Sequence, residues 1–95
     1  MKINFNQSFK DFKGEAILEN GKEKSISEMV ATLLFSGHGI TKNEDKLKAF
    51  SLSQKIYSSK GAIEITVEDA SMIKKVAESL SAGAYAQVIA IIENK

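Results

Sequence analysis

The sequence contains no cysteine and no arginine. Without cysteine, the chain can form neither disulfide bonds nor thiolate metal sites, and it has no cysteine nucleophile. All 13 basic residues are lysine, which lacks the planar fork through which arginine binds phosphate and guanine. The absence of arginine disfavours a protein that recognises a DNA sequence. It does not exclude contacts between lysine and phosphate.

Histidine is nearly absent as well, since His38 is the only one. It lies between Gly37 and Gly39, with no acidic residue at ligand spacing, and is expected to be a solvated loop residue. The sequence has no glycine-rich phosphate loop, no paired histidines and no nucleophile elbow. Glu68 and Asp69 are adjacent, but a position in a first helical turn explains both. We therefore expect no enzyme: no catalytic residue, no cofactor and no metal.

Long apolar runs are also missing. The longest, residues 82–92, is about eleven residues, whereas a membrane span needs roughly 20. Residues 1–6 lack the apolar run of a signal peptide. We expect a cytoplasmic protein without a membrane partner. The net charge of +1 argues against a strong nonspecific attraction to nucleic acid.

The composition that remains is typical of a folded protein. Hydrophobic residues make up 43% and charged residues 26% of the chain, and 95 residues fit a single compact domain, residues 1–95. A domain of this size buries only about 60–65% of the surface that its unfolded chain exposes. Association with a second chain would add stability.

Residues 82–92 are the most apolar stretch, and Gln87 is their only clearly polar side chain. At helical spacing, Tyr85, Ile89 and Ile92 share one stripe, while Val88 and Ile91 occupy another. A helix that is apolar nearly all round is expected to be buried. We therefore predict that this helix forms the centre of the core, with a subunit interface as an additional role and Lys95 favouring its C-terminal end.

The N-terminal quarter has the features of short strands. Residues 2–6 alternate, with Ile3 and Phe5 on one face. Residues 15–19 and 22–24 flank an Asn-Gly pair, which predicts a β-hairpin. Phe9 and Phe12 have two interpretations: a turn whose rings close the end of the core, or an exposed aromatic–lysine patch that stacks bases.

Two Ser/Thr-x-x-Glu capping boxes predict helix starts, at Ser25 and at Thr41. The first helix should end near Gly37, with Phe35 outside its apolar stripe of Ile26, Met29, Val30, Leu33 and Leu34. The second helix has two adjacent apolar rows, which together predict a wide buried side: Leu47, Phe50 and Tyr57, then Ala49, Leu52 and Ile56. Lys48 and Lys55 share the opposite side, which indicates either a solvated face or a site for an acidic partner or a phosphate backbone.

Residues 62–66 predict a further strand, with Ile63 and Ile65 facing inward. Thr66 then caps a third helix, with Asp69 three residues later. The buried stripe of this helix is expected to contain Ala70, Ile73, Val76, Ala77 and Leu80. The fold class is therefore α+β: a small antiparallel sheet with a β-hairpin, packed against about four helices.

From Ser25 to the C-terminus, the order of features resembles a group of small phage and prophage proteins. The resemblance is carried by the capped helix of residues 25–34, by residues 44–50, by residues 64–69 and by Gly83-Ala84-Tyr85 before an apolar helix. It covers about three quarters of the chain. The resemblance implies a viral origin and supplies no activity.

The function expected from these patterns is that of a small, phage-encoded, non-enzymatic protein–protein interaction module. We expect it to act as a homo-oligomer in the host cytoplasm, as a modulator of a host factor or an accessory in assembly. Two alternatives are a nucleic-acid-binding accessory protein that uses its lysines and a small-ligand (nucleotide) sponge. Four residues are candidates for partner contact: Phe35, Lys48, Lys55 and Tyr85.

Overall fold

The structure is a computed structural model that describes residues 1–93. Lys95, and with it the expected effect of its charge, lies outside the described residues. The elements within residues 1–93 are, in order, β1 (Lys2–Ile3), β2 (Leu18–Glu19), β3 (Lys22–Glu23), α1 (Ile26–Ser36), α2 (Asn43–Ser58), β4 (Ile63–Glu64), α3 (Val67–Ala77) and α4 (Ala82–Glu93). The expected α+β class, with a hairpin and four helices in this part of the chain, is confirmed.

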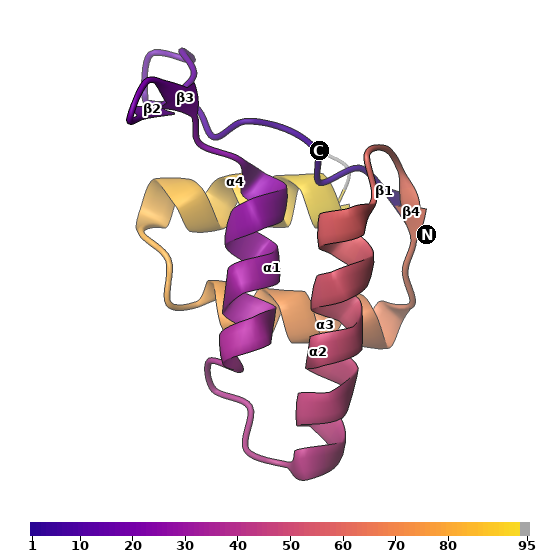
Figure 1. The fold of residues 1–95 in the computed structure, drawn as a ribbon. Coiled ribbons are helices and arrows are strands. Elements are labelled where there is room, and N and C mark those ends of the chain that lie inside the picture. Colours follow the sequence, from indigo (N-terminus) through magenta and orange to yellow (C-terminus); the bar gives the residue numbers. More distant parts are fainter. Residues whose placement is uncertain (94–95) are drawn as a thin grey trace.

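The helices lie in two layers. In Figure 1, α1 and α2 run side by side in opposite directions, and α3 and α4 cross behind them at a steep angle. The contacts of α1 with α2 are the most extensive between any two elements of residues 1–93, followed by those of α1 with α3. Among the elements of residues 1–93, none covers the outer side of the α1–α2 pair (Figure 1).

Within residues 1–93, the strands form two separate antiparallel pairs. β1 pairs with β4, so that Ile3 lies opposite Ile63. β2 pairs with β3 around Asn20 and Gly21, whose φ angles of 54° and 80° are both positive, as a type I′ turn requires. The predicted hairpin is confirmed, and Asn-Gly is the pair that adopts this turn with least strain.

The predicted ends of α1 are confirmed, but the capping box at Ser25 is half formed: within residues 1–93, the Glu28 side chain accepts no bond from the Ser25 amide. The side-chain oxygen of Ser25 accepts a hydrogen bond from the Glu28 amide at 3.4 Å, which satisfies one of the amides left without a partner at a helix start. Gly37 has a left-handed φ of 70°, and its amide donates to the carbonyls of Leu33 and Leu34. A residue without Cβ adopts this conformation at little cost.

The capping box predicted at Thr41 is wrong. The N-cap of α2 is Lys42, and it makes no side-chain capping bond. Because the helix begins one residue later than the pattern implies, the Thr41 hydroxyl does not occupy the position from which an N-cap side chain reaches the N3 amide. The box at Thr66 is complete: its hydroxyl accepts from the Asp69 amide, and the Asp69 carboxylate accepts from the Thr66 amide, each at 3.0 Å.

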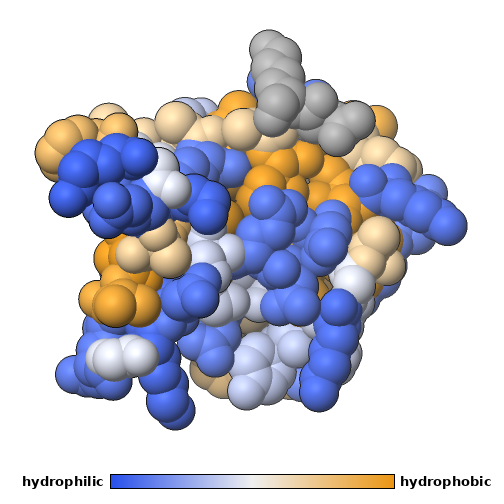
Figure 2. Space-filling model, turned by 90° about the horizontal axis from the view of Figure 1, so that it is seen from above, coloured by the Kyte–Doolittle hydropathy of each residue, from blue (hydrophilic) through white to orange (hydrophobic). Residues whose placement is uncertain are grey.

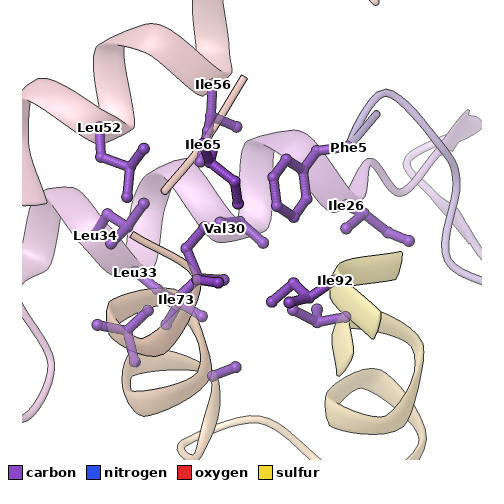
Figure 3. Close-up of a cluster of buried hydrophobic side chains, with 14 of the residues drawn as sticks. Phe5, Ile26, Val30, Leu33, Leu34, Leu52, Ile56, Ile65, Ile73 and Ile92 are labelled. Atoms are coloured by element: carbon purple, nitrogen blue, oxygen red, sulfur yellow. The ribbon is translucent and has the colours of Figure 1, made fainter. Parts of the chain in front are cut away.

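The core lies between the two helix layers (Figure 3). α1, α2 and α3 point apolar side chains into it, and Phe5, Ile65 and Ile92 close it from other elements. The fully covered large side chains include Phe9, Leu34, Ile56, Ile65, Ile73, Val30, Val76 and Val88. The predicted inward stripe of α1 is confirmed, with Met29 half-buried at its margin. In α3, Ala70, Ile73, Val76 and Ala77 are buried as expected, whereas Leu80 lies beyond the end of the helix and is half-buried.

The C-terminal helix is not the centre of this core. Val88 and Ile92 of α4 are buried, but Ile89 and Ile91 are only half-buried. Ala82 and Ala86 are exposed. The contacts of α4 with other elements of residues 1–93 are mainly those with α3, so one side of the helix is covered. The all-round apolar character of α4 therefore exceeds what this fold buries.

The wide buried side predicted for the second helix is also wrong. Ala49, Leu52 and Ile56 are buried, as expected. Leu47 is 72% exposed, and Phe50 and Tyr57 are exposed as well. The neighbouring helices cover only the row of Ala49, Leu52 and Ile56. The other row faces outward, because α1 meets α2 along one flank.

Candidate functional site

The exposed row of α2 meets an exposed ring from α1. The ring centroids of Phe35 and Phe50 are 5.8 Å apart, and their planes are tilted by 50°, a favourable arrangement for an aromatic pair. Phe35 is 66% exposed, Phe50 49% and Tyr57 66%. We call these three side chains, with the groove between their helices, the aromatic face.

The groove has a volume of about 310 Å³ and is lined by residues of both helices. On α1, the lining residues follow helical spacing: Glu28, Ala31, Thr32 and Phe35. On α2 they are Ser53, Gln54 and Tyr57. The groove therefore has small residues at its base, aromatic rings on its walls and few charged groups.

Ser53 is the one buried polar residue of the described chain, and it lies under this groove. Its hydroxyl donates to the Phe50 carbonyl at 2.6 Å, so its hydrogen-bonding group is already used within α2. No buried side-chain nitrogen or oxygen of residues 1–93 lacks a hydrogen-bond partner. The chemistry that the face offers is consequently apolar and aromatic contact.

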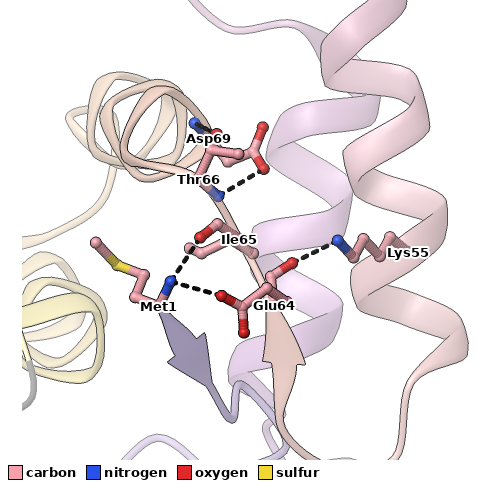
Figure 4. Close-up of polar contacts among 6 residues, drawn as sticks. All are labelled: Met1, Lys55, Glu64, Ile65, Thr66 and Asp69. Atoms are coloured by element: carbon pink, nitrogen blue, oxygen red, sulfur yellow. Dashed lines mark hydrogen bonds and ion pairs between the residues drawn. The ribbon is translucent and has the colours of Figure 1, made fainter.

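Lys48 and Lys55 lie on the other flank of α2, together with Asp69 and Leu52. The Lys55 ammonium donates to the Glu64 carbonyl (Figure 4), which ties α2 to β4. Lys48 also borders a neighbouring hollow of about 490 Å³, where lysines alternate with carboxylates: Lys42, Asp45, Lys48, Glu68, Asp69 and Lys75. This mixed surface is not the continuous positive groove that a phosphate backbone follows.

Of the four expected contact residues, Phe35 is the one in the aromatic face. Lys48 and Lys55 share a hollow on the opposite flank of α2. Tyr85 lies on α4, in the other helix layer (Figure 1), where it is 36% exposed. The fold therefore does not bring these four residues into one site.

Phe50 and Tyr57 were not among the expected contact residues, because their helical spacing with Leu47 indicated burial. A signal was present in the width of the apolar side, since the two rows together are wider than one neighbouring helix covers. Phe9 and Phe12 also behave differently from each other. Phe9 closes the core, in line with the first of the two interpretations, whereas Phe12 is 98% exposed at a turn.

Phe12 borders another hollow, of about 560 Å³, which is also lined by Met29, Leu80 and Ala84. Its turn is held by Gln87, whose side-chain amide binds both backbone groups of Lys10, at 2.8 and 2.9 Å. The lone polar residue of the apolar helix thus anchors the N-terminal segment. Figure 2, which views the molecule from the hairpin end, shows apolar side chains gathered in separate patches among hydrophilic ones.

The N-terminal ammonium of Met1 forms the most connected polar contact of the β1–β4 pair (Figure 4). It donates to the Glu64 carboxylate and to the Ile65 carbonyl, each at 3.0 Å. The hydrogen bond from this ammonium, and then its charge, hold the pKa of the Glu64 carboxyl below its ordinary value of 4.5. The contact joins the two strands and touches no hollow of the aromatic face.

No helix of residues 1–93 combines the length and the apolar character needed to cross a membrane. In the same residues, no three histidine, cysteine, aspartate or glutamate side chains gather in a group that could hold a metal ion. His38 is exposed in its loop, as expected. Comparisons of the chain with family models, with curated proteins and with solved structures give no match.

Proposed function

We propose that the chain is a small, non-enzymatic protein–protein interaction module that acts as a homo-oligomer and binds through its aromatic face. A phage origin, and a role in modulating a host factor or in assembly, are part of this proposal and are suggested by the resemblance of residues 25–95. The observation that carries it is the exposure of Phe35, Phe50 and Tyr57 together, on one side of two helices.

Physical arguments support a binding role for these rings. Aromatic side chains are enriched at the centres of protein interfaces, where they supply large contact area with few rotatable bonds. The groove between the rings has a base of small residues and an open outer side, which suits a helix laid along it. The Phe35–Phe50 pair is held in place by mutual contact, so little rotamer freedom remains to be lost on binding.

The test uses the tagged chain as bait in a cell lysate that also contains an untagged copy of the chain. The matched baits are the wild type, Phe50→Ser in the aromatic face and Lys48→Glu on the opposite flank of α2. The wild type and Lys48→Glu should retain the same proteins, and Phe50→Ser should lose them. If all three baits retain the same proteins, or if none retains any, the proposal is overturned. Circular dichroism of each bait checks that it is folded.

A further inference from the structure

The charges at the two ends of the aromatic face have opposite sign. Glu28 lines the groove beside Tyr57, and it is the one charged residue of α1. Lys46 lies four residues before Phe50 and eleven before Tyr57, so it occupies the same side of α2. Both Glu28 and Lys46 are exposed. Neither forms an ion pair within the part of the chain that the structure describes.

The spacing of these charges follows from the helices. Tyr57 lies near Glu28, because both line one groove. At about 1.5 Å per residue, Lys46 is roughly 16 Å from Tyr57 along α2. The face therefore carries a negative end, an aromatic middle and a positive end. A half-turn about an axis through its middle exchanges the two ends, so the pattern is complementary to itself, as a two-fold interface requires.

We propose that a second copy of the chain covers the aromatic face, with the two α2 helices antiparallel and related by a two-fold axis. Glu28 of each copy then faces Lys46 of the other, and the rings of both copies are enclosed between these ion pairs. This inference rests on the proposed function, and it names the occupant of the same surface.

Charge complementarity selects the second copy and its orientation. A parallel arrangement would set Glu28 against Glu28 and Lys46 against Lys46, which is unfavourable, and it would align the helix dipoles. The remaining polar groups of the face, on Thr32 and Gln54, both donate and accept hydrogen bonds, so each can pair with its own copy. The antiparallel arrangement leaves no charged residue of the face opposite a like charge.

The experiment measures the dimer dissociation constant by sedimentation. The samples are the full-length wild type, Glu28→Lys, Lys46→Glu and an equimolar mixture of the two variants. Each single reversal replaces two attractions by two repulsions, and it should weaken dimerisation by about ten-fold or more. In the mixture, one chain is positive at both ends of the face and the other is negative at both. The variants should therefore associate with each other as tightly as the wild type does with itself.

Matched controls keep the result specific. Glu44→Lys also reverses a charge in a first helical turn, and Lys48→Glu also reverses a lysine of α2, but both residues lie off the stripe of Lys46 and Phe50. Neither control should change the dissociation constant of the dimer. If Glu28→Lys fails to fold, the milder pair Glu28→Gln and Lys46→Gln replaces the reversals, and each should weaken dimerisation by a few-fold.

Three results would overturn the inference: a wild type that is monomeric at every concentration up to about millimolar, a dimer indifferent to charge at Glu28 and Lys46, or a mixture that does not regain affinity. These results are separable from the bait experiment. A monomer that still loses captured proteins on Phe50→Ser contradicts the second copy as occupant, and with it the homo-oligomer. It leaves standing the binding of another protein through the aromatic face.

Discussion

At the scale of single residues, Glu64 shows how one contact couples stability to pH. Its carboxylate accepts a hydrogen bond from the Met1 ammonium, and its pKa is lowered in the folded chain. A group whose pKa is lower when folded stabilises the fold above its unfolded pKa. That contribution is lost as the pH falls through the lowered value, because the proton then binds the folded chain as well.

We therefore expect Glu64→Gln to lower the free energy of unfolding slightly at neutral pH and to have no effect in strong acid. The difference should shrink as the pH falls from about 4.5. Denaturant unfolding of both chains between pH 2 and 7 measures it. Acetylation of the Met1 amine should have the same effect as the substitution, and Glu64→Gln should change nothing further in the acetylated chain. A constant difference at all pH values would contradict this assignment.

Two glycines make a matched pair for backbone strain. Gly37 has a positive φ at the end of α1, while Gly83 lies within α4 without one; a Cβ would meet no atom within 4 Å at either residue. Gly37→Ala should therefore destabilise the fold by about 1 kcal/mol through conformation alone. Gly83→Ala should stabilise it by about 0.5–1 kcal/mol. Denaturant unfolding measures both, and shifts of the same sign would contradict the argument.

At the scale of elements, local signals placed the hairpin turn and several helix ends, whereas the strands are shorter than predicted. Ser25, Gly37 and Thr66 act as the sequence suggested, since each bond spans a few residues. Thr41 fits the same Thr-x-x-Glu pattern, yet α2 begins after Lys42. The pattern indicates which capping bonds can form. The path of the chain before the helix decides which residue has the extended backbone of an N-cap.

The two threonines give a direct comparison. Thr66→Ala removes an acceptor for the Asp69 amide and should lower the free energy of unfolding by about 1 kcal/mol. Thr41→Ala removes no capping bond and should change it by less than about 0.5 kcal/mol. Thermal or denaturant unfolding of the two variants measures the contrast. Equal losses would mean that Thr41 does cap α2.

The candidate site was the least predictable part of the molecule. The spacing of Phe50 and Tyr57 places them on one side of α2, but spacing cannot say whether another helix covers that side. Phe35 was expected off the α1 stripe, and its exposure agrees. Its contact with Phe50 depends on how α1 packs against α2, which is a long-range property that no local pattern encodes.

At the scale of the whole molecule, the layering decides which helix is central. α1, α2 and α3 bury side chains toward one another, while α4 is covered mainly from one side. The expectation that α4 forms the centre came from its composition, which is apolar on nearly every face. Composition measures the tendency to be buried, and in a chain this short the number of neighbouring elements sets how much of that tendency is satisfied.

Substitutions at two isoleucines test this arrangement. Ile73 of α3 is fully covered, so Ile73→Ala should leave a cavity and lower the free energy of unfolding by about 3 kcal/mol. Ile89 of α4 is half-buried, and Ile89→Ala should cost about 1 kcal/mol. Denaturant unfolding below the concentration at which the chain associates measures both. A larger loss of unfolding free energy for Ile89→Ala than for Ile73→Ala would mean that α4 is the centre of the core after all.

The two hydrogen bonds between the Gln87 side chain and the backbone of Lys10 have a consequence for folding during synthesis. The two residues are 77 positions apart, so Gln87 leaves the ribosome well after Lys10. Until α4 emerges, the turn that carries Phe12 has its internal hydrogen bonds around Asp11 but lacks its bonds to α4. The turn around Lys10, although synthesised earlier, therefore reaches its final position only after α4 has formed.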